Sequence, residues 1–257
     1  MSLFEELIED KKEDEKIIKS FKTKDSLCQN IFDGDADGSK MKKEIRKKLL
    51  EISNNFIESL GVEFFIHDIV LTGSLANYGW SEYSDVDLHI IIDYSDIKGN
   101  NESKSILSII KEFFDAKKNV WNEKHNVKIK NFDVELYVQD ISEPHISSGV
   151  YSVLNDEWVI EPKKENPSID DRKILEKGEE FAKKIDKIIN LSDNENALPK
   201  IEELRKKLKK FRQSGLETGG EYSYENLTFK LLRRNGYIKK LLDLKTHITD
   251  KKLSITQ

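Results

Sequence analysis

The 257-residue sequence has one cysteine, four prolines, twelve glycines and no long hydrophobic run. Because Cys28 is alone, no intrachain disulfide can form. The low glycine and proline content excludes collagen-like and linker-rich chains. The apolar runs are far shorter than the ~20 residues of a membrane-spanning helix, and the first residues lack the apolar core of a secretion signal. We therefore expect a cytoplasmic protein with no membrane partner.

The sequence also has little net charge, although charged residues make up 35% of it. Its 43 basic and 48 acidic residues leave a formal charge of −5. This balance excludes a protein that is held on nucleic acid or anionic lipid by bulk charge alone. Basic residues are concentrated locally, in residues 200–212 and 230–240.

Hydrophobic periodicity predicts an α+β protein with two parts. Apolar residues recur every three or four positions in 41–60 and 101–121, which predicts helices, and short β-branched or alternating runs predict strands at 64–71, 85–93 and 132–138. A hairpin is expected around residues 155–156. Beyond residue 165 only helical patterns remain, at 168–190, 197–213 and 223–244. We therefore divide the chain into a charged N-terminal segment (1–40), a mixed-sheet domain with flanking helices (41–165) and an all-helical domain (166–257).

Two carboxylates open the second expected strand, in the run Asp85-Val86-Asp87. Residues i and i+2 of a strand project to the same face, so the two carboxylates should lie side by side, with Val86 turned into the core. They repel each other unless a cation lies between them. A hard divalent ion such as Mg²⁺, which binds one or two carboxylates together with phosphate oxygens, meets this need.

A Gly-Ser pair ends the strand before it. Gly73 allows a sharp turn and a close approach to a ligand. If Ser74 opens a short helix, the free backbone N–H groups there favour a phosphate. A phosphate-binding turn and a metal-binding carboxylate pair, ten residues apart, are the parts that a nucleoside triphosphate with Mg²⁺ requires.

The runs LTGS and DVDLHI, followed by a later strand carboxylate in FDVELYV, resemble the signature of the polymerase-β-like nucleotidyltransferase superfamily. The resemblance covers roughly residues 64–140. TGSLANYGW, VELYVQD and the GEYSYENLTFKLLRRNGYIKKL run also resemble uncharacterised proteins of this type that are common in phages. The resemblance implies a nucleotidyltransferase-type mixed sheet followed by a helical domain.

The resemblance implies that Asp85 and Asp87 bind two Mg²⁺ ions, with Mn²⁺ as an alternative. The third carboxylate is either Glu135 or Asp133, because both lie on the same face of one expected strand. The superfamily's apolar-Asp-apolar pattern favours Asp133, whereas the VELYV likeness favours Glu135. We prefer Glu135, whose role would be to share the catalytic metal and help activate the acceptor hydroxyl.

By the same resemblance, Gly73 and Ser74 hold the triphosphate, and the helical domain supplies cations to the β- and γ-phosphates. Lys230 and Arg233 are the candidates, since residues at i and i+3 share a helix face. The implied reaction is transfer of a nucleoside monophosphate from a triphosphate, expected to be ATP, to a hydroxyl of a protein, an RNA or a small molecule, with release of pyrophosphate.

Other readings of the sequence stay open. The fold could be a catalytically inactive binding or regulatory module. Residues 33–44, DGDADGSKMKKE, fit the calcium-binding EF-hand loop formula, although Lys40 stands where an apolar residue is usual and no second loop exists. His89 could contact metal or base, or simply be hydrogen-bonded. Tyr78 and Trp80 could stack on a nucleobase, or simply pack.

Overall fold

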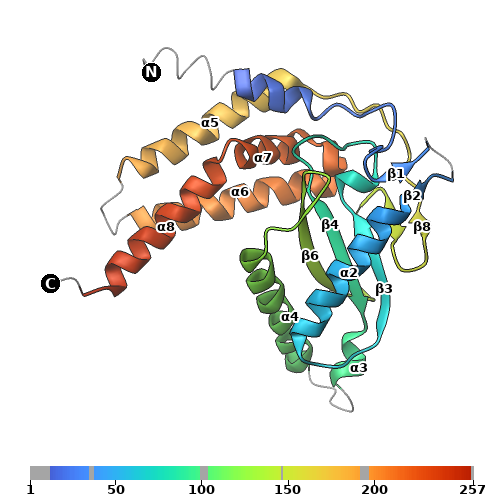
Figure 1. Ribbon diagram of the computed structural model, residues 1–257. Helices are drawn as coiled ribbons and strands as arrows, with labels where there is room; N and C mark the ends of the chain where they lie inside the picture. The colour runs from blue at the N-terminus through green and yellow to red at the C-terminus, as the bar shows by residue number, and fades with distance from the viewer. Residues whose placement is uncertain (1–11, 35–37, 99–103, 146, 192–196, 256–257) are drawn as a thin grey trace. The chain divides into compact units, whose positions relative to one another are not determined.

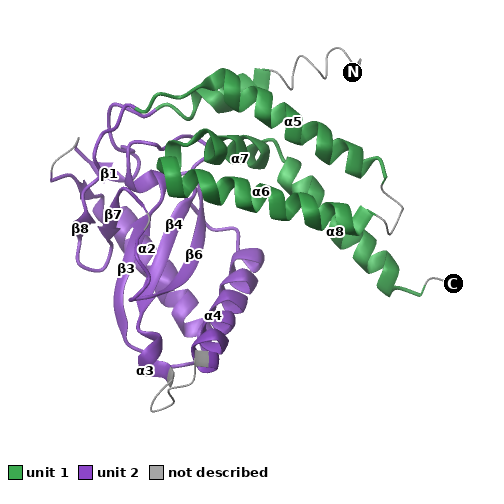
Figure 2. Cartoon of the chain, turned by 180° about the vertical axis from the view of Figure 1, so that it is seen from behind, with its two compact units in different colours: residues 1–22, 167–257 green, residues 23–166 purple. Residues whose placement is uncertain are grey.

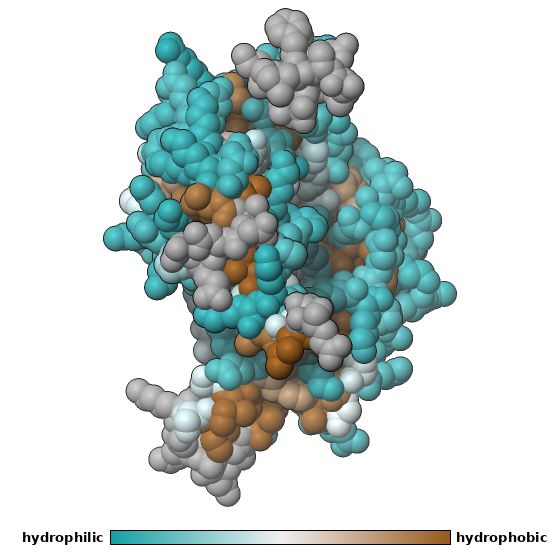
Figure 3. Space-filling view, turned by 90° about the vertical axis from the view of Figure 1, so that its left-hand side faces the viewer, coloured by the Kyte–Doolittle hydropathy of each residue, from teal (hydrophilic) through white to brown (hydrophobic). Residues whose placement is uncertain are grey.

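The structure is a computed structural model, and it describes residues 12–34, 38–98, 104–145, 147–191 and 197–255. The chain divides into two compact units (Figure 2). Unit 2 comprises residues 23–166, and unit 1 combines residues 1–22 with residues 167–257. The surface seen in Figure 3 is mainly hydrophilic, with smaller apolar areas, as the high content of charged residues leads one to expect.

Unit 2 contains a mixed six-stranded sheet, so the chain has an α+β fold (Figure 1). The strands lie in the order β5-β6-β4-β3-β7-β8. Their bounds are β3 (Ile66–Thr72), β4 (Val86–Ile92), β5 (Lys128–Ile129), β6 (Phe132–Asp140), β7 (Val150–Ser152) and β8 (Glu157–Ile160). β4 and β6 are parallel, and the other neighbours are antiparallel. Two further short strands, β1 (Phe32–Asp33) and β2 (Lys40–Met41), pair with each other.

Two long helices cover one face of this sheet. They are α2 (Lys43–Leu60) and α4 (Lys104–Lys124), and a short helix α3 (Tyr94–Lys98) follows β4. The α2 and α4 helices touch through Phe56 and Trp121, whose rings meet edge to face at 6.1 Å. The spacing in 41–60 predicted α2, and its expected apolar residues are all buried: Ile45, Leu49, Ile52, Phe56 and Leu60. Burying each of them contributes about 1.5–3 kcal/mol.

The alternation along β4 decides which face of the sheet is polar. Val86, Leu88 and Ile90 are buried in the core with α2 and α4. The residues between them, Asp87 and His89, are only partly buried. Because neighbouring strand residues point to opposite faces, Asp87 and His89 lie on the face that α2 and α4 do not cover.

The described residues of unit 1 contain helices and connecting segments, with no strand among them. Besides a helical segment at residues 12–19, they form α5 (Asp171–Ile189), α6 (Ala197–Gly219), a 3₁₀ turn η2 (Gly220–Tyr222), α7 (Tyr224–Arg234) and α8 (Tyr237–Leu253). Their core includes Phe181, Leu204, Leu208 and Leu241. No helix in the described part of the chain combines the length and the apolar character needed to cross a membrane.

One sequence expectation in unit 1 needs correction. The helical pattern at 223–244 is two helices, because Gly236 has a left-handed φ of 75° and interrupts the chain between α7 and α8. Gly215 lies within α6, where an added Cβ would come within 2.5 Å of the Glu225 Cβ. In the charged N-terminal segment, Ile17 and Phe21 are buried.

Candidate functional site

The Gly-Ser turn lies at the C-terminal end of β3 and is shaped by Gly73. This glycine has a φ of 72°, and a 3₁₀ turn, η1 (Ser74–Ala76), follows it. A Cβ at position 73 would be 1.9 Å from Oδ2 and 2.9 Å from Cγ of Asp87. The Asp87 carboxylate therefore lies directly against the glycine Cα. Both the backbone conformation and the close approach require glycine.

The sheet register brings the carboxylates of different strands together. Asp87 on β4 is opposite Thr72 of β3 and opposite Glu135 of the parallel strand β6. Neighbouring strands are about 4.8 Å apart, so Asp87 and Glu135 are adjacent on the uncovered face. Asp85 immediately precedes β4. The ligand oxygens of these three carboxylates are not all within 4.8 Å of one another.

Tyr137 connects the three carboxylates electrostatically. Its hydroxyl donates a 2.5 Å hydrogen bond to Oε2 of Glu135. Burial raises the pKa of Tyr137 strongly, and so do the hydrogen bond and the negative charges of Glu135, Asp87 and Asp85. All three carboxylates therefore act on one phenol. Lys118 lies 4.6 Å from the centroid of the Tyr137 ring.

Serine hydroxyls brace the turn. The Oγ atoms of Ser74 and Ser84 are 2.7 Å apart, and Ser84 also accepts a hydrogen bond from the N–H of Ser81. The N–H of Gly73 donates to Oγ of Ser147 at 3.2 Å. The Gly-Ser turn is therefore held by Ser147, which accepts from Gly73, and by Ser84, which contacts Ser74.

Asp133 occupies a different setting from Glu135. Its Oδ1 is 2.6 Å from Nζ of Lys128, its partner in the β5–β6 pair, and both side chains are about half exposed. An exposed ion pair of this kind contributes only about 0–1 kcal/mol. Asp133 therefore has a nearby cation, whereas Glu135 is the residue in register with Asp87.

Lys230 and Arg233 lie on α7 in unit 1. Lys230 is half-buried, and no hydrogen bond or ion pair to it is found within the described residues. Burial lowers the pKa of Lys230, Glu221 raises it, and the positive charges of Arg234, Arg233 and Arg212 lower it further. These four cations therefore make a strongly positive region in α6 and α7.

The other residues singled out in the sequence have structural partners. His89 Nδ1 is 2.8 Å from Oε1 of Gln139, its ring stacks on Tyr137, and burial lowers its pKa. Tyr78 is buried, and the Trp80 indole donates to the Ser26 carbonyl at 2.9 Å. Both aromatic residues are therefore held by packing within unit 2.

Two of the four candidate calcium ligands, Asp35 and Asp37, lie outside the described residues. The two described candidate ligands face lysines. Asp33 is 3.9 Å from Lys42, and Glu44 is 2.9 Å from Lys130, which lowers the pKa of Glu44. Calcium binding at residues 33–44 stays a prediction.

Three site residues were missed by sequence reasoning. Tyr137 could have been found, because it is two residues from Glu135 on an alternating strand and so shares its face. Ser84 precedes the Asp-x-Asp run directly but carries no signal of its own. Ser147 comes from a distant loop, and nothing local predicts its contact with Gly73.

The chain was compared with protein-family models, with curated proteins and with solved structures, and none of them matches it.

Proposed function

We propose that the chain is a Mg²⁺-dependent nucleotidyltransferase of the polymerase-β-like type, with a catalytic domain at 41–165 and a helical domain at 166–257. It would transfer a nucleoside monophosphate from a triphosphate, expected to be ATP, to a hydroxyl group. The observation that carries the proposal is the Asp87 carboxylate lying against the Gly73 Cα while Glu135 stands beside it on the next strand.

The donor set fits Mg²⁺. Asp85, Asp87 and Glu135 offer only oxygen atoms, which hard cations prefer. Burial, the hydrogen bond from Tyr137 to Glu135 and the negative charges of the three carboxylates all raise the pKa of Tyr137. A cation beside the carboxylates would relieve their repulsion. Asp85 and Asp87 would hold two ions, and Glu135 would share one of them. When bound, such ions neutralise charge on the phosphate oxygens and orient the reacting groups.

The chain's own residues have separate tasks in this proposal. Gly73 presents no side chain, so the Asp87 carboxylate can lie against the backbone of the turn. The hydroxyl of the adjacent Ser74 would donate to a phosphate oxygen. Glu135 accepts the proton of the acceptor hydroxyl as its oxygen bonds to the α-phosphorus and the bond to pyrophosphate breaks. Tyr137 donates to Oε2 of Glu135, which orients the carboxylate and leaves Oε1 to take the proton.

Lys230 and Arg233 would neutralise the β- and γ-phosphates. Burial and the neighbouring arginines lower the pKa of Lys230. An anion bound beside Lys230 would stabilise its charged form. The positive region of α6 and α7 supports a role in binding an anion.

The test is an assay for pyrophosphate release and label transfer. The full chain is incubated with Mg²⁺ and each α-³²P nucleoside triphosphate, with and without fractions of a cell extract that separate protein, RNA and small molecules. We expect label transfer that is abolished in Asp87→Asn. Glu157→Gln on the exposed strand β8 serves as the matched control and should retain activity.

Two results would decide against this reading. If no triphosphate gives pyrophosphate release or label transfer, the chain is not this enzyme. If a Mg²⁺–triphosphate complex then still binds, with an affinity that depends on Asp87, the inactive binding module is the better description.

A further inference from the structure

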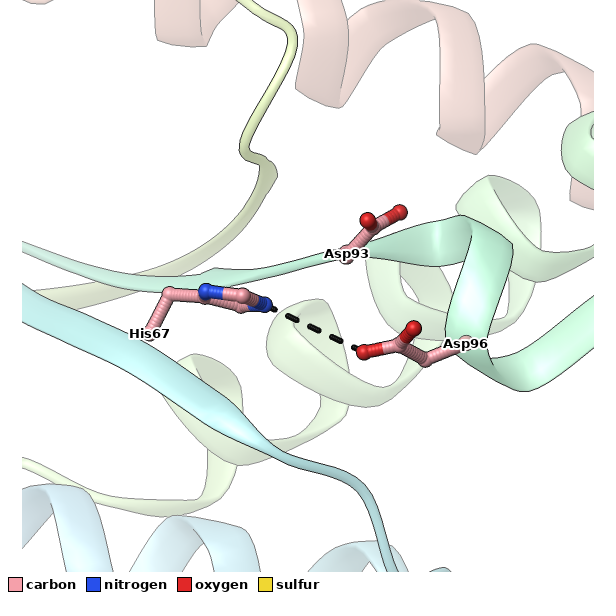
Figure 4. A group of neighbouring side chains, drawn as sticks. All are labelled: His67, Asp93 and Asp96. Atoms are coloured by element: carbon pink, nitrogen blue, oxygen red, sulfur yellow. Dashed lines mark ion pairs between the residues drawn. The ribbon is translucent and has the colours of Figure 1, made fainter.

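A second group of metal-ligating side chains lies at the other end of the sheet. His67 lies in β3, Asp93 follows β4 directly, and Asp96 lies in α3 (Figure 4). Each of them offers one ligand atom, and these atoms all lie within 4.8 Å of one another. Within the described ranges, no other set of three His, Cys, Asp or Glu side chains meets this criterion.

This group is separate from the carboxylates at Gly73. His67 precedes Gly73 by six residues along an extended strand, which corresponds to about 20 Å at ~3.3 Å per residue. Asp93 is likewise six residues beyond Asp87 on the neighbouring strand. A ligand of one group therefore cannot contact the other.

A β-bulge directs the His67 side chain. Ile66 pairs with Ile92, whereas Asp68 pairs with Ile91, so His67 is the extra residue of β3. Bulges re-aim side chains and are frequent beside functional sites. The Phe65 ring packs edge to face against the imidazole, with the two ring centroids 4.8 Å apart, and also restrains it. The imidazole points toward the Asp96 carboxylate (Figure 4).

The outer nitrogen of His67 lacks a hydrogen-bond partner within the described chain. Its Nε2 atom is buried, and the nearest recorded acceptor, Oδ2 of Asp96, is 3.9 Å away. This separation is too long for a hydrogen bond. A buried nitrogen without a partner is costly, and a metal ion between the two atoms would satisfy both of them.

Asp93 is held in place from the start of α3. Its Oδ1 accepts a 2.7 Å hydrogen bond from the N–H of Ser95. The carboxylate is therefore fixed relative to β4, whereas Asp96 is exposed and free to adjust its rotamer. The ligand atoms of the three residues, which lie within 4.8 Å of one another, need to move only slightly closer together to bind an ion. The ligands of a tetrahedral ion with bonds of about 2.0–2.1 Å are about 3.3 Å apart.

We propose that His67, Asp93 and Asp96 form a binding site for a divalent transition metal, Zn²⁺ foremost. One imidazole nitrogen with two carboxylate oxygens suits Zn²⁺ and its first-row neighbours, whereas Mg²⁺ and Ca²⁺ prefer oxygen-only sites. The ion would join the start of β3, the end of β4 and α3. It is independent of the nucleotidyltransferase reaction.

The test is Zn²⁺ titration of the full chain by calorimetry, with Co²⁺ as a coloured substitute whose visible absorption reports the ligand set. The titration is repeated in Asp85→Asn/Asp87→Asn, which removes the expected Mg²⁺ ligands. We expect a saturable Zn²⁺ site that is retained in Asp85→Asn/Asp87→Asn. It should be lost in His67→Gln and at least about tenfold weaker in Asp96→Asn, and it should be retained in the control His125→Gln.

Asp96→Asn is the decisive variant if His67→Gln unfolds, because Asp96 is exposed on a short helix. The proposal is overturned if the wild-type chain shows no saturable Zn²⁺ binding below millimolar concentration. It is also overturned if Zn²⁺ affinity is unchanged in Asp96→Asn. In either case the His67–Asp96 pair is simply a weak ion pair.

Discussion

Gly73 is the residue on which the candidate site most depends, because it has two independent reasons to be glycine. Its φ of 72° with a ψ of −162° lies in a backbone region that is essentially restricted to glycine, and the Asp87 carboxylate lies against its Cα. Strain from the backbone conformation alone is about 1–3 kcal/mol. The close approach of the Asp87 carboxylate also sets the position of this proposed metal ligand.

Gly73→Ala should therefore lose more than backbone strain explains. The added methyl group must displace the Asp87 carboxylate, so we expect label transfer to fall at least ~100-fold, about 2.7 kcal/mol in transition-state stabilisation. The control is Gly61→Ala, which has a φ of 68°, a ψ of 19° and open space around the added Cβ, so it reports the cost of a positive φ in the left-handed helical region alone. Equal losses of stability and activity in the two variants would contradict the role of the close contact.

Glu135 and Asp133 differ in surroundings, and substitution should separate them. Glu135→Gln is expected to abolish label transfer, because it removes the proton acceptor beside Asp87. Asp133→Asn should retain activity and change the free energy of unfolding by less than about 1 kcal/mol, since only an exposed ion pair is lost. Label transfer at 25 °C and urea unfolding measure the two effects. Loss of activity in Asp133→Asn alone would reverse the assignment.

At the scale of elements, close packing explains why α6 has a glycine in its interior. Gly215 lies within α6, where η2 and α7 approach so closely that Ser223 and Glu225 leave no room for a side chain. Helix propensity alone would favour alanine here by about 1 kcal/mol.

Gly215→Ala is accordingly expected to destabilise the protein rather than stabilise it. The new Cβ would meet Oγ of Ser223 at 2.6 Å, and overpacking of this kind costs about 1–3 kcal/mol. Thermal unfolding should show a lower melting temperature for this variant, whereas Ser214→Ala, on the exposed neighbouring position, should be neutral or slightly stabilising. A higher melting temperature for Gly215→Ala would show that α7 moves away easily.

Hydrophobic periodicity predicted helices and strands correctly where a local pattern of residues determines the structure. The stripe in α2 and the alternation of β4 are local signals, and both were found in the expected places. The pairing of Asp87 with Glu135 depends on register between strands 48 residues apart, which no local pattern contains. The Ser147 contact with Gly73 and the bulge at His67 could not be predicted for the same reason.

At the scale of the whole molecule, the proposed functional residues belong to different units. The carboxylates are in unit 2, and Lys230 with its neighbouring arginines is in unit 1. Lys230 is proposed to contact the β- and γ-phosphates, and this role can be tested by itself.

Lys230→Met should therefore weaken the binding of a Mg²⁺-loaded triphosphate and leave the binding of the monophosphate unchanged. Loss of a hydrogen bond to a charged group costs about 1.5–3 kcal/mol, which corresponds to roughly a 10- to 150-fold rise in dissociation constant. Calorimetry with ATP and AMP measures the difference, and Lys251→Met near the end of α8 is the control. Equal effects on both nucleotides would place Lys230 outside the phosphate-binding set.

The order of the strands also has a consequence for the time at which the site forms during synthesis. β3 and β4 are sequential and antiparallel, so Gly73 and Asp87 can meet as soon as this hairpin leaves the ribosome. Glu135 follows Asp87 by 48 residues, which at 5–20 residues per second is a delay of roughly 2–10 s. During that interval β4 presents an unpaired, isoleucine-rich edge to the cell, which is a hazard for aggregation. The nascent chain would thus need protection from other chains before it can carry out any chemistry.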